Sequence, residues 1–384
     1  MKLRTIINIS LEGPLSRGAC LSHSEAVRSI CTCLSGTGSL GRKDGGMNRK
    51  WGVFVAGLCT VGVLVGCGSI RVGEPPVVVK RTQMHMGTLV AITAVAPTKE
   101  EAHVSIEAGF HEIKRLEQLL STWISASELS QVNAAAGQRP VAVSRETLDL
   151  VSRSLEMARL TDGGFNIAVG PAVEAWSVTE RQRRPSSVEL DRLRPLVDWS
   201  VIQLNWTANT IFLPQPGMRI DVGGIGKGYA ADRAVGVMKG AGARGGVVAL
   251  SGDIKTFGDL PGMKGFPVGI RHPRQEGTLI ATMDLKNEAV STAGDYERYF
   301  EQDGIRYHHI LDPKTLEPAR KCQSVTVIAA EGTVADGLDT GIFVLGPEKG
   351  MALVEQLPNV EAVIIDDQGR ITVSSGLRSR LRYP

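Results

Sequence analysis

Cysteine is scarce in this sequence, and its distribution excludes a disulfide framework. Six cysteines occur among 384 residues. Five of them lie in the first 67 residues: Cys20, Cys31, Cys33, Cys59 and Cys67. Only Cys322 lies beyond that point. A single thiol in the remaining chain can form neither an internal disulfide nor a cysteine-ligated zinc site.

An excess of basic charge is also absent once the N-terminal segment is set aside. The whole sequence has 43 Lys and Arg against 40 Asp and Glu. Residues 1–66 hold eight basic and three acidic residues, which leaves 35 and 37 in the rest of the chain and a net charge of about −2. We therefore expect no nucleic-acid partner.

A long apolar span is missing as well, but residues 47–66 have the pattern of a lipoprotein signal peptide. Basic residues after Met47 precede an apolar stretch from Trp51 to Val65, which is too short and too rich in glycine for a membrane-spanning helix. The stretch ends in Leu-Val-Gly-Cys, which resembles the lipobox of bacterial lipoproteins. This pattern predicts lipidation of Cys67.

The signal peptide divides the chain into four parts. Residues 1–46 precede it without a sustained period, and we interpret them as a mis-assigned start or a disordered leader, with Met47 as the true start. Residues 67–80 are expected to be a lipid-anchored tether, followed by one folded domain over residues 81–384. The protein is then expected in the bacterial cell envelope, anchored to an inner or outer membrane leaflet and facing the periplasm.

Strand and helix patterns alternate irregularly along the domain. Alternating residues around Gly87-Thr88 predict a pair of strands. Helices are expected over residues 98–120, 144–160, 187–196, 229–239, 333–345 and 348–356, and further strands at 201–205, 210–213, 218–222, 246–250, 266–270, 278–284, 305–310, 324–330 and in a hairpin at 361–374. Mixed elements without strict βαβ order and without a repeat predict an α+β class, a single compact domain of mixed sheets and packed helices.

The stretch DVGGIGKGYAAD, residues 221–232, allows two interpretations. Its glycines would let backbone amides approach an anion at a helix N-terminus, where Lys227 would add a charge. Gly228 follows the lysine, so the stretch is no P-loop, and it does not fit the Rossmann fingerprint. A tight turn between a strand and a helix explains the same residues, so both interpretations stay open.

A second stretch, ADGLDT at residues 335–340, carries oxygen ligands. On a helix, Asp336 and Thr340 share one face and Asp339 lies beside them. Carboxylate and hydroxyl oxygens suit Mg²⁺ better than zinc. Alternatively, Asp336 only complements the dipole of the first helical turn.

Three further segments are weaker signals. His309 follows a strand pattern in YHHILDPKT, where a histidine is more often structural than catalytic. STAGDYERYF (residues 291–300) and TDGGFNIAVGP (residues 161–171) are rich in small residues and could close around a ligand or only pack. Neither a G-x-S-x-G nor an H-E-x-x-H motif occurs.

Taken in order, these segments resemble the ApbE family of FAD:protein FMN transferases, which are periplasmic or lipid-anchored. The resemblance covers roughly residues 82–374, and its motifs are Met86-Gly87-Thr88, Ser121-Thr122-Trp123, Gly164-Phe165-Asn166, DVGGIGKGYAAD, LSGDI (250–254), STAGDYERYF, HHILDP and ADGLDT. It implies transfer of FMN from FAD to a threonine or serine of an acceptor protein through a phosphoester bond, with Mg²⁺ and release of AMP. The implied acceptors are flavoproteins such as a subunit of a membrane redox complex or a secreted flavin reductase.

The resemblance also assigns residues. It implies flavin contacts at Met86, Trp123, Gly164, Phe165, Asn166, Asp221, Lys227 and Leu311. It implies a metal held by Asp336, Asp339 or both, by Thr340 and by the backbone carbonyl of Gly224. His309 is the implied proton-transfer residue, and Lys227 is expected to offset charge on the pyrophosphate.

Four positions depart from the family pattern, and two other functions remain open. The sequence has Asn166 in place of the usual aspartate, Ser251 and Leu316 in place of glycine, and Ala293 in place of serine. The metal residues and Lys227 are retained, so we expect an active enzyme. The alternatives are an Mg²⁺-dependent FAD pyrophosphatase that yields FMN and AMP, and a lipoprotein that binds FAD without catalysis.

Overall fold

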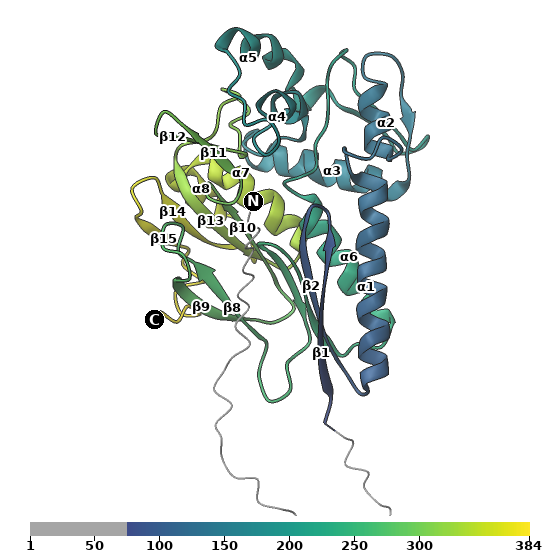
Figure 1. Ribbon diagram of the computed structural model, residues 1–384, viewed down its shortest axis with the longest axis vertical. Helices are drawn as coiled ribbons and strands as arrows, with labels where there is room; N and C mark the ends of the chain where they lie inside the picture. Colours follow the sequence, from purple (N-terminus) through teal and green to yellow (C-terminus); the bar gives the residue numbers. More distant parts are fainter. Residues whose placement is uncertain (1–74) are drawn as a thin grey trace, which may run out of the picture. The chain divides into compact units, whose positions relative to one another are not determined.

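An eight-stranded antiparallel sheet forms the centre of the protein. The structure is a computed structural model that describes residues 75–384 (Figure 1). The strands run in the order β1-β2-β6-β7-β10-β13-β14-β15, and every neighbouring pair is antiparallel. Their bounds are Val77–His85, Thr88–Ala96, Gly245–Leu250, Asp253–Phe257, Ala289–Gly294, Cys322–Ala329, Glu361–Asp366 and Ile371–Val373.

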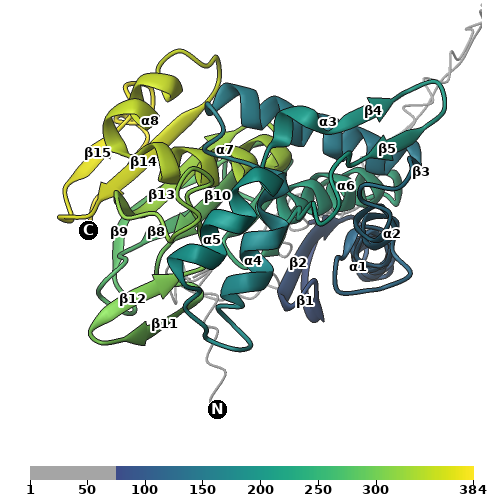
Figure 2. The ribbon, with the colours of Figure 1, turned by 90° about the horizontal axis from the view of Figure 1, so that it is seen from above.

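Long helices cover one face of this sheet. They are α1 (Lys99–Leu120), α6 (Gly226–Gly240), α7 (Gly332–Leu345) and α8 (Pro347–Val354), and α3 (Arg145–Leu160) packs on α7. Helix α1 packs on β1 and β2, α6 on β6 and β7, and α7 on β10 and β13. In Figure 2, α1, α6, α7 and α8 follow one another along the sheet in this order. The site described below lies where α6 and α7 meet the middle of the sheet.

Helix α1 illustrates why these segments are helical. Thr98 accepts a hydrogen bond from the backbone N–H of Glu101, whose carboxylate accepts one from the Thr98 N–H, and this capping box fixes the first turn. Apolar residues then recur at intervals of three or four, so one stripe is buried against the sheet. The buried residues of this stripe include Ile106, Phe110, Ile113, Leu116 and Leu120.

The opposite face of the sheet is covered by the hairpin β8 (Phe266–Arg271) and β9 (Leu279–Leu285) together with the C-terminal segment. The central strands therefore have apolar side chains on both faces. On β14, Ala362 and Ile364 join the core under the helices, whereas Val363 and Ile365 join the core under the hairpin. This division follows from the two-residue period of a strand.

The remaining elements frame one edge of the helical layer. The short helices α4 (Gly170–Trp176) and α5 (Ser187–Leu193) share a small core with the hairpin β11 (Tyr299–Gln302) and β12 (Ile305–His308). Helix α2 (Glu128–Ala134) follows α1 in the sequence. A small sheet has the order β3-β5-β4, with bounds Val141–Ala142, Thr210–Phe212 and Gln203–Asn205.

The predicted α+β class is confirmed, and most predicted helices are present within one or two residues at their ends. The strand predicted at 218–222 is wrong. The side chain of Asn133 instead forms both backbone hydrogen bonds of Ile220. Its amide oxygen accepts from the Ile220 N–H at 2.7 Å, and its amide nitrogen donates to the Ile220 carbonyl at 2.9 Å. The Asp221 N–H donates to Ile167, so no sheet partner is needed in this segment.

The predicted boundary of the folded domain also needs correction. Strand β1 begins at Val77, so residues 77–80 belong to the sheet and the predicted tether over 67–80 is too long. The predicted leader (1–46), the signal peptide (47–66) and Cys67 lie outside the described residues. Within residues 75–384, no helix combines the length and apolar composition that a membrane crossing requires.

The close contact between α6 and α7 requires a glycine, without a side chain, at position 228. A Cβ at Gly228 would lie 2.1 Å from the carbonyl oxygen of Gly332, and backbone cannot easily yield there. Asp232 on α6 also accepts hydrogen bonds from the Gly332 and Thr333 N–H groups, and so caps α7 from the neighbouring helix.

We therefore predict that Gly228→Ala lowers the free energy of unfolding by roughly 1–3 kcal/mol, as overpacking at close contacts does. Gly236 is the matched control because it lies on the same helix, is exposed, and has no heavy atom within 4 Å of a Cβ. Gly236→Ala should be neutral or gain up to about 1 kcal/mol from helix propensity. Urea unfolding of both variants tests this prediction. Equal free energies of unfolding for the two variants would contradict the argument that α6 and α7 lie too close at Gly228 for a side chain.

Candidate functional site

The glycine stretch after Asp221 forms the start of α6. The helix begins at Gly226, three residues before the predicted start at Tyr229, so Lys227 lies in its first turn. The Gly228 N–H, one of the free donors at this helix N-terminus, donates to the carboxylate of Asp336 at 2.8 Å. The stretch is thus a tight turn into a helix whose terminus faces a carboxylate of α7.

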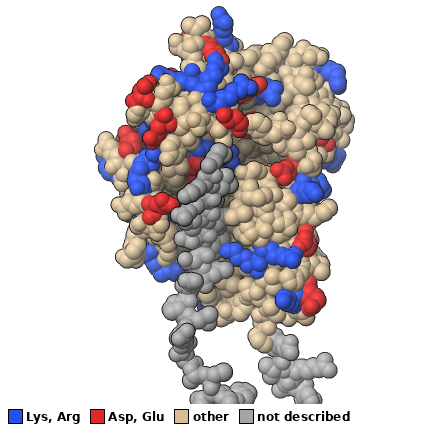
Figure 3. Space-filling view, in the orientation of Figure 1, with Lys and Arg blue, Asp and Glu red and all other residues tan. Residues whose placement is uncertain are grey.

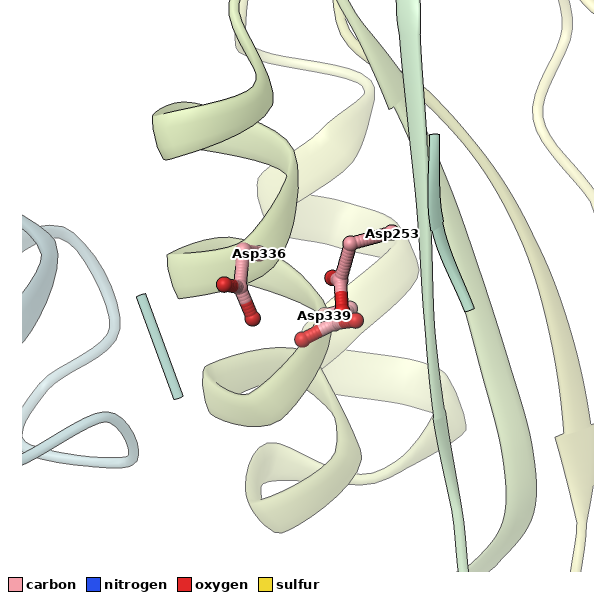
Figure 4. A group of neighbouring side chains, drawn as sticks. All are labelled: Asp253, Asp336 and Asp339. Carbon is pink, nitrogen blue, oxygen red and sulfur yellow. The ribbon is translucent and has the colours of Figure 1, made fainter. Parts of the chain in front are cut away.

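Three carboxylates meet in front of this helix terminus. Asp336 and Asp339 come from α7 and Asp253 from the start of β7, and Figure 4 shows the three groups facing one another. One oxygen of each lies within 4.8 Å of the others, and none of the residues is more than 4% exposed. The Lys227 ammonium pairs with Asp253 and lies 3.6 Å from Asp336.

The charges in this cluster do not balance. Three buried carboxylates face one ammonium, which leaves two negative charges if all are ionised. Burial and the nearby Asp253 carboxylate raise the pKa of Asp336 to about 7, and burial with Asp336 raises the pKa of Asp339 well above its usual range. Burial alone would lower the pKa of Lys227, but the carboxylates outweigh it and keep the lysine charged.

The hydrogen bonds of Ser291 on β10 also indicate that the cluster lacks positive charge. Its hydroxyl oxygen is in hydrogen-bond contact with Asp253 and lies 2.6 Å from an oxygen of Asp339. A hydroxyl has only one proton to donate, so it cannot satisfy two carboxylates at once. Either one carboxyl group holds a proton, or a cation takes its place.

A divalent cation fits this arrangement because it would neutralise the two remaining charges with oxygen ligands. Thr340 contributes a hydroxyl beside Asp339, at 3.1 Å. A Cβ at Gly224 would lie 3.2 Å from that hydroxyl oxygen, so the backbone of Gly224 approaches the same corner closely. Oxygen-only ligands at a buried carboxylate site are typical of Mg²⁺.

His309 lines the same cavity. Its backbone N–H donates to the Arg298 carbonyl, and its ring nitrogen Nδ1 lies 3.3 Å from the same oxygen. His309 is exposed where it lines the cavity, although protein atoms lie densely around the ring. Enclosure by protein atoms, reinforced by the Arg298 charge, lowers the pKa of His309 to about 3. The imidazole is therefore neutral at pH 7 and able to accept a proton.

The cavity has a volume of about 650 Å³. This size suits a ligand as large as a dinucleotide. Most of the predicted site residues line it: Trp123, Gly164, Phe165, Asn166, Asp221, Gly224, Lys227, His309, Leu311, Asp336, Asp339 and Thr340. Met86 is outside the lining, although the next two residues, Gly87 and Thr88, are part of it. Trp123 stands out at the rim because it is 78% exposed.

The four departures from the family pattern have distinct surroundings. Asn166 is buried and uses both ends of its amide within the protein, accepting from Ala168 and donating to Val197. Ser251 and Leu316 have φ values of 59° and 61°, a conformation that glycine adopts at lower cost. Ala293 lies on β10 in the cavity lining and offers no hydrogen-bonding group.

Sequence reasoning missed three residues that organise the site. Asp253 and Ser291 lay inside quoted motifs without an assigned role, and Asp232 was only the last residue of the glycine stretch. The available signal for Asp253 was a carboxylate directly after a glycine turn that follows a strand. Its pairing with Lys227 joins residues 26 positions apart, which no local pattern reveals.

The raised pKa of Asp336 predicts how the metal-free protein responds to pH. Between about pH 4 and pH 7 the folded state holds more protons than the unfolded state, so the free energy of unfolding should fall as pH rises. We expect a decrease on the order of 2–4 kcal/mol from pH 5 to pH 8 in EDTA, and a smaller decrease for Asp336→Asn. Asp259→Asn, at an exposed carboxylate, is the control, and identical slopes for all three proteins would contradict the prediction.

Comparisons with known proteins identify relatives of this chain by sequence and by structure. The sequence model described as "ApbE family" matches residues 86–364. The chain is 34% identical over 349 residues to the FAD:protein FMN transferase of Treponema pallidum, covering 86% of this chain and 94% of that protein. It is 34% identical over 274 residues to one from Klebsiella pneumoniae, covering 71% and 85%.

Solved structures have the same fold. The ApbE protein of Thermotoga maritima superposes with a TM-score of 0.75 at 31% identity, covering 80% of this chain and all of that one. The flavin transferase ApbE from Vibrio cholerae gives a TM-score of 0.71 at 27% identity, covering 80% of this chain and 100% of the other. Sequence and fold agree over nearly all of the described domain, and the chain therefore belongs to the ApbE family.

Proposed function

We propose that this protein transfers FMN from FAD to a threonine or serine side chain of an acceptor protein, in an Mg²⁺-dependent reaction that forms a phosphoester and releases AMP. The observation that carries the proposal is the buried group of Asp253, Asp336 and Asp339 beside Lys227, in one cavity with the neutral His309. The relatives named above are FAD:protein FMN transferases, which supports flavin transfer as the reaction.

The reaction requires the acceptor hydroxyl oxygen to attack the FMN phosphorus while the pyrophosphate bond breaks. His309 is the proposed acceptor of the hydroxyl proton, and its lowered pKa keeps the ring unprotonated at neutral pH. Its backbone contact with Arg298 fixes the segment on which it stands. Proton transfer to a positioned base typically accelerates such steps by about 10²–10⁴.

The role proposed for Lys227 and the carboxylate cluster is to stabilise negative charge on the phosphates. Lys227 is charged and held by Asp253, so its ammonium can face the pyrophosphate without rotating freely. When bound, Mg²⁺ would neutralise phosphate charge, with Asp336, Asp339, Thr340 and the Gly224 carbonyl as the proposed ligands. Trp123 and Phe165 supply aromatic surface to the flavin or adenine ring.

The same geometry supports a second reaction, in which water replaces the acceptor hydroxyl and FAD is hydrolysed to FMN and AMP. The cavity is open enough at Trp123 for water to enter. A non-catalytic FAD carrier explains the carboxylate group less well, because holding FAD requires no three buried carboxylates. The acceptor is proposed to be a flavoprotein such as a subunit of a membrane redox complex or a secreted flavin reductase.

We predict that the full chain, incubated with FAD, Mg²⁺ and such a candidate acceptor, adds the mass of FMN to the acceptor and makes it fluorescent in a gel. Asp336→Ala should reduce labelling about 10²–10³-fold, because it removes a proposed metal ligand. Asp191→Ala on α5 is the control, since its carboxylate is exposed and pairs only with Arg194.

Three outcomes separate the candidate functions. Acceptor labelling that is lost in Asp336→Ala supports transfer. FMN and AMP without acceptor labelling would identify the hydrolase, and bound FAD with neither product would identify the carrier. Labelling by Asp336→Ala at the wild-type rate would contradict the role of the carboxylate group.

We also propose that Cys67 is lipidated and anchors the protein to the cell envelope on the periplasmic side. The support is the sequence pattern of residues 47–67, because these residues lie outside the described part of the chain. Cys67→Ser should move the protein from the membrane fraction to the soluble fraction while the purified protein keeps its FAD binding. Membrane association that persists in Cys67→Ser would contradict the anchor.

A further inference from the structure

The turn between β1 and β2 forms part of the cavity wall. Its two residues, Met86 and Gly87, have φ values of 50° and 67°, and His85 pairs with Thr88 across the turn. Both residues of this two-residue hairpin loop therefore adopt the left-handed conformation. Gly87 and Thr88 line the cavity, and Figure 3 shows the surface hollowed between this turn and α4. The conformation of the turn thus determines the shape of the cavity wall at this point.

Methionine is an unusual first residue for such a turn. Glycine, asparagine and aspartate adopt positive φ values most readily, whereas a residue with a long side chain does so at a cost in free energy. Gly87 meets this requirement at the second position of the turn, but Met86 does not meet it at the first. The left-handed conformation of Met86 must therefore be held by contacts with the rest of the protein.

Glu117 on α1 supplies such a contact. Its carboxylate oxygen Oε1 accepts a hydrogen bond from the backbone N–H of Met86 at 2.8 Å. The other oxygen, Oε2, lies 3.7 Å from Nδ1 of His85, and the His85 ring packs against Phe110 of the same helix with 5.8 Å between the ring centroids. Hydrogen bonds to a charged acceptor are stronger than those between neutral groups. Glu117 therefore holds both the turn and the strand residue before it.

The position of Glu117 in α1 does not favour a carboxylate. The residue lies in the last turn of the helix, which ends at Leu120 and has no basic residue in that turn. The helix dipole makes negative charge unfavourable there. Among residues 75–384, the only ion-pair partner of Glu117 is His85, so no salt bridge within α1 accounts for the carboxylate. Its contacts with the β1–β2 turn are the interactions that explain a glutamate at this position.

The turn also joins two other parts of the cavity lining. The end of α1, to which the turn is bonded, continues into Thr122 and Trp123, and both of these residues line the cavity. The terminal methyl group of Met86 lies 3.9 Å from the position that a Cβ would take at Gly226, the first residue of α6. Lys227 follows directly and lines the cavity as well. The turn therefore connects the end of α1 with the start of α6.

We propose that Glu117 is a positioning residue for FAD, which holds the turn at Met86 and Gly87 in the conformation that bound FAD requires; this inference rests on the proposed function. Glu117 is not among the residues that line the cavity, so it acts through the Met86 N–H. A wall that is ordered before the ligand arrives loses less conformational freedom on binding, which increases affinity. Loss of the carboxylate should therefore weaken FAD binding and leave the chemical step unchanged at saturating FAD.

Three variants of Glu117 in the full chain test the proposal, with the Kd for FAD measured from the change in flavin fluorescence on binding. We expect Glu117→Ala to raise this Kd roughly tenfold, because it removes the acceptor of the Met86 N–H. Glu117→Gln retains an amide oxygen as acceptor and should stay within about threefold of the wild-type Kd. Glu117→Asp, whose carboxylate is one methylene group shorter, should behave like Glu117→Ala and replaces it if the alanine variant does not fold.

Glu107→Ala is the matched control, because Glu107 also lies on α1 and also pairs with a residue of β1, Arg81, but neither of them lines the cavity. This variant should keep the wild-type Kd for FAD. An unchanged Kd in Glu117→Ala and Glu117→Asp would overturn the proposal, and so would an equal increase in Glu107→Ala or in Glu117→Gln. Lower stability of Glu117→Ala to urea with an unchanged Kd would assign the residue to folding alone.

The wild-type titration separates this inference from the proposed function. Wild-type protein that binds no FAD would refute the proposed function together with the inference. Wild-type protein that binds FAD, with the same Kd in the Glu117 variants, would refute the inference alone. In the labelling assay, the account predicts a higher KM for FAD in Glu117→Ala at an unchanged kcat, and a lower kcat at an unchanged KM would contradict it.

Discussion

The ion pair between Lys227 and the buried carboxylates of Asp253 and Asp336 is the interaction on which the rest of the site depends. An ammonium and three carboxylates are costly to bury, and Lys227 offsets only one of the three carboxylate charges. Removal of one partner leaves an uncompensated charge in the interior. The same imbalance is the reason for which we propose a divalent cation at this cluster.

The arrangement of three elements of the fold brings the residues of this cluster together. Asp253 stands at the start of a central strand, Lys227 in the first turn of α6, and Asp336 on α7, so three separate elements must meet. The close crossing at Gly228 brings the two helices near enough for its N–H to reach Asp336. A side chain at this point would separate the helices and with them the charged groups. The glycines of the stretch therefore serve packing first, and a phosphate cradle is not required to explain them.

Sequence patterns predicted correctly those elements that depend on interactions between residues close together in the chain. Helix α1 was predicted at the correct residues because its capping box and its apolar stripe are both written in consecutive positions. The strand predicted at 218–222 failed because Asn133, a residue more than 80 positions away, takes the backbone bonds of Ile220. Strand β10 was not predicted, since its small residues have weak strand preference and are buried by long-range contacts. The family resemblance located Lys227 and Asp336, but the role of Asp253 depends on a pairing that only the folded chain reveals.

The central claim is that Asp336 and its neighbours hold a divalent cation at the end of α6, beside Lys227. Diffraction from crystals grown with Mn²⁺ and FAD, with data collected for the anomalous signal of manganese, tests this claim most directly. The account predicts an anomalous peak roughly 2.0–2.3 Å from a carboxylate oxygen of Asp336, with the Thr340 hydroxyl and the Gly224 carbonyl as further ligands. A structure with FAD bound, no peak at this position, and Lys227 still filling the space between the carboxylates would contradict it.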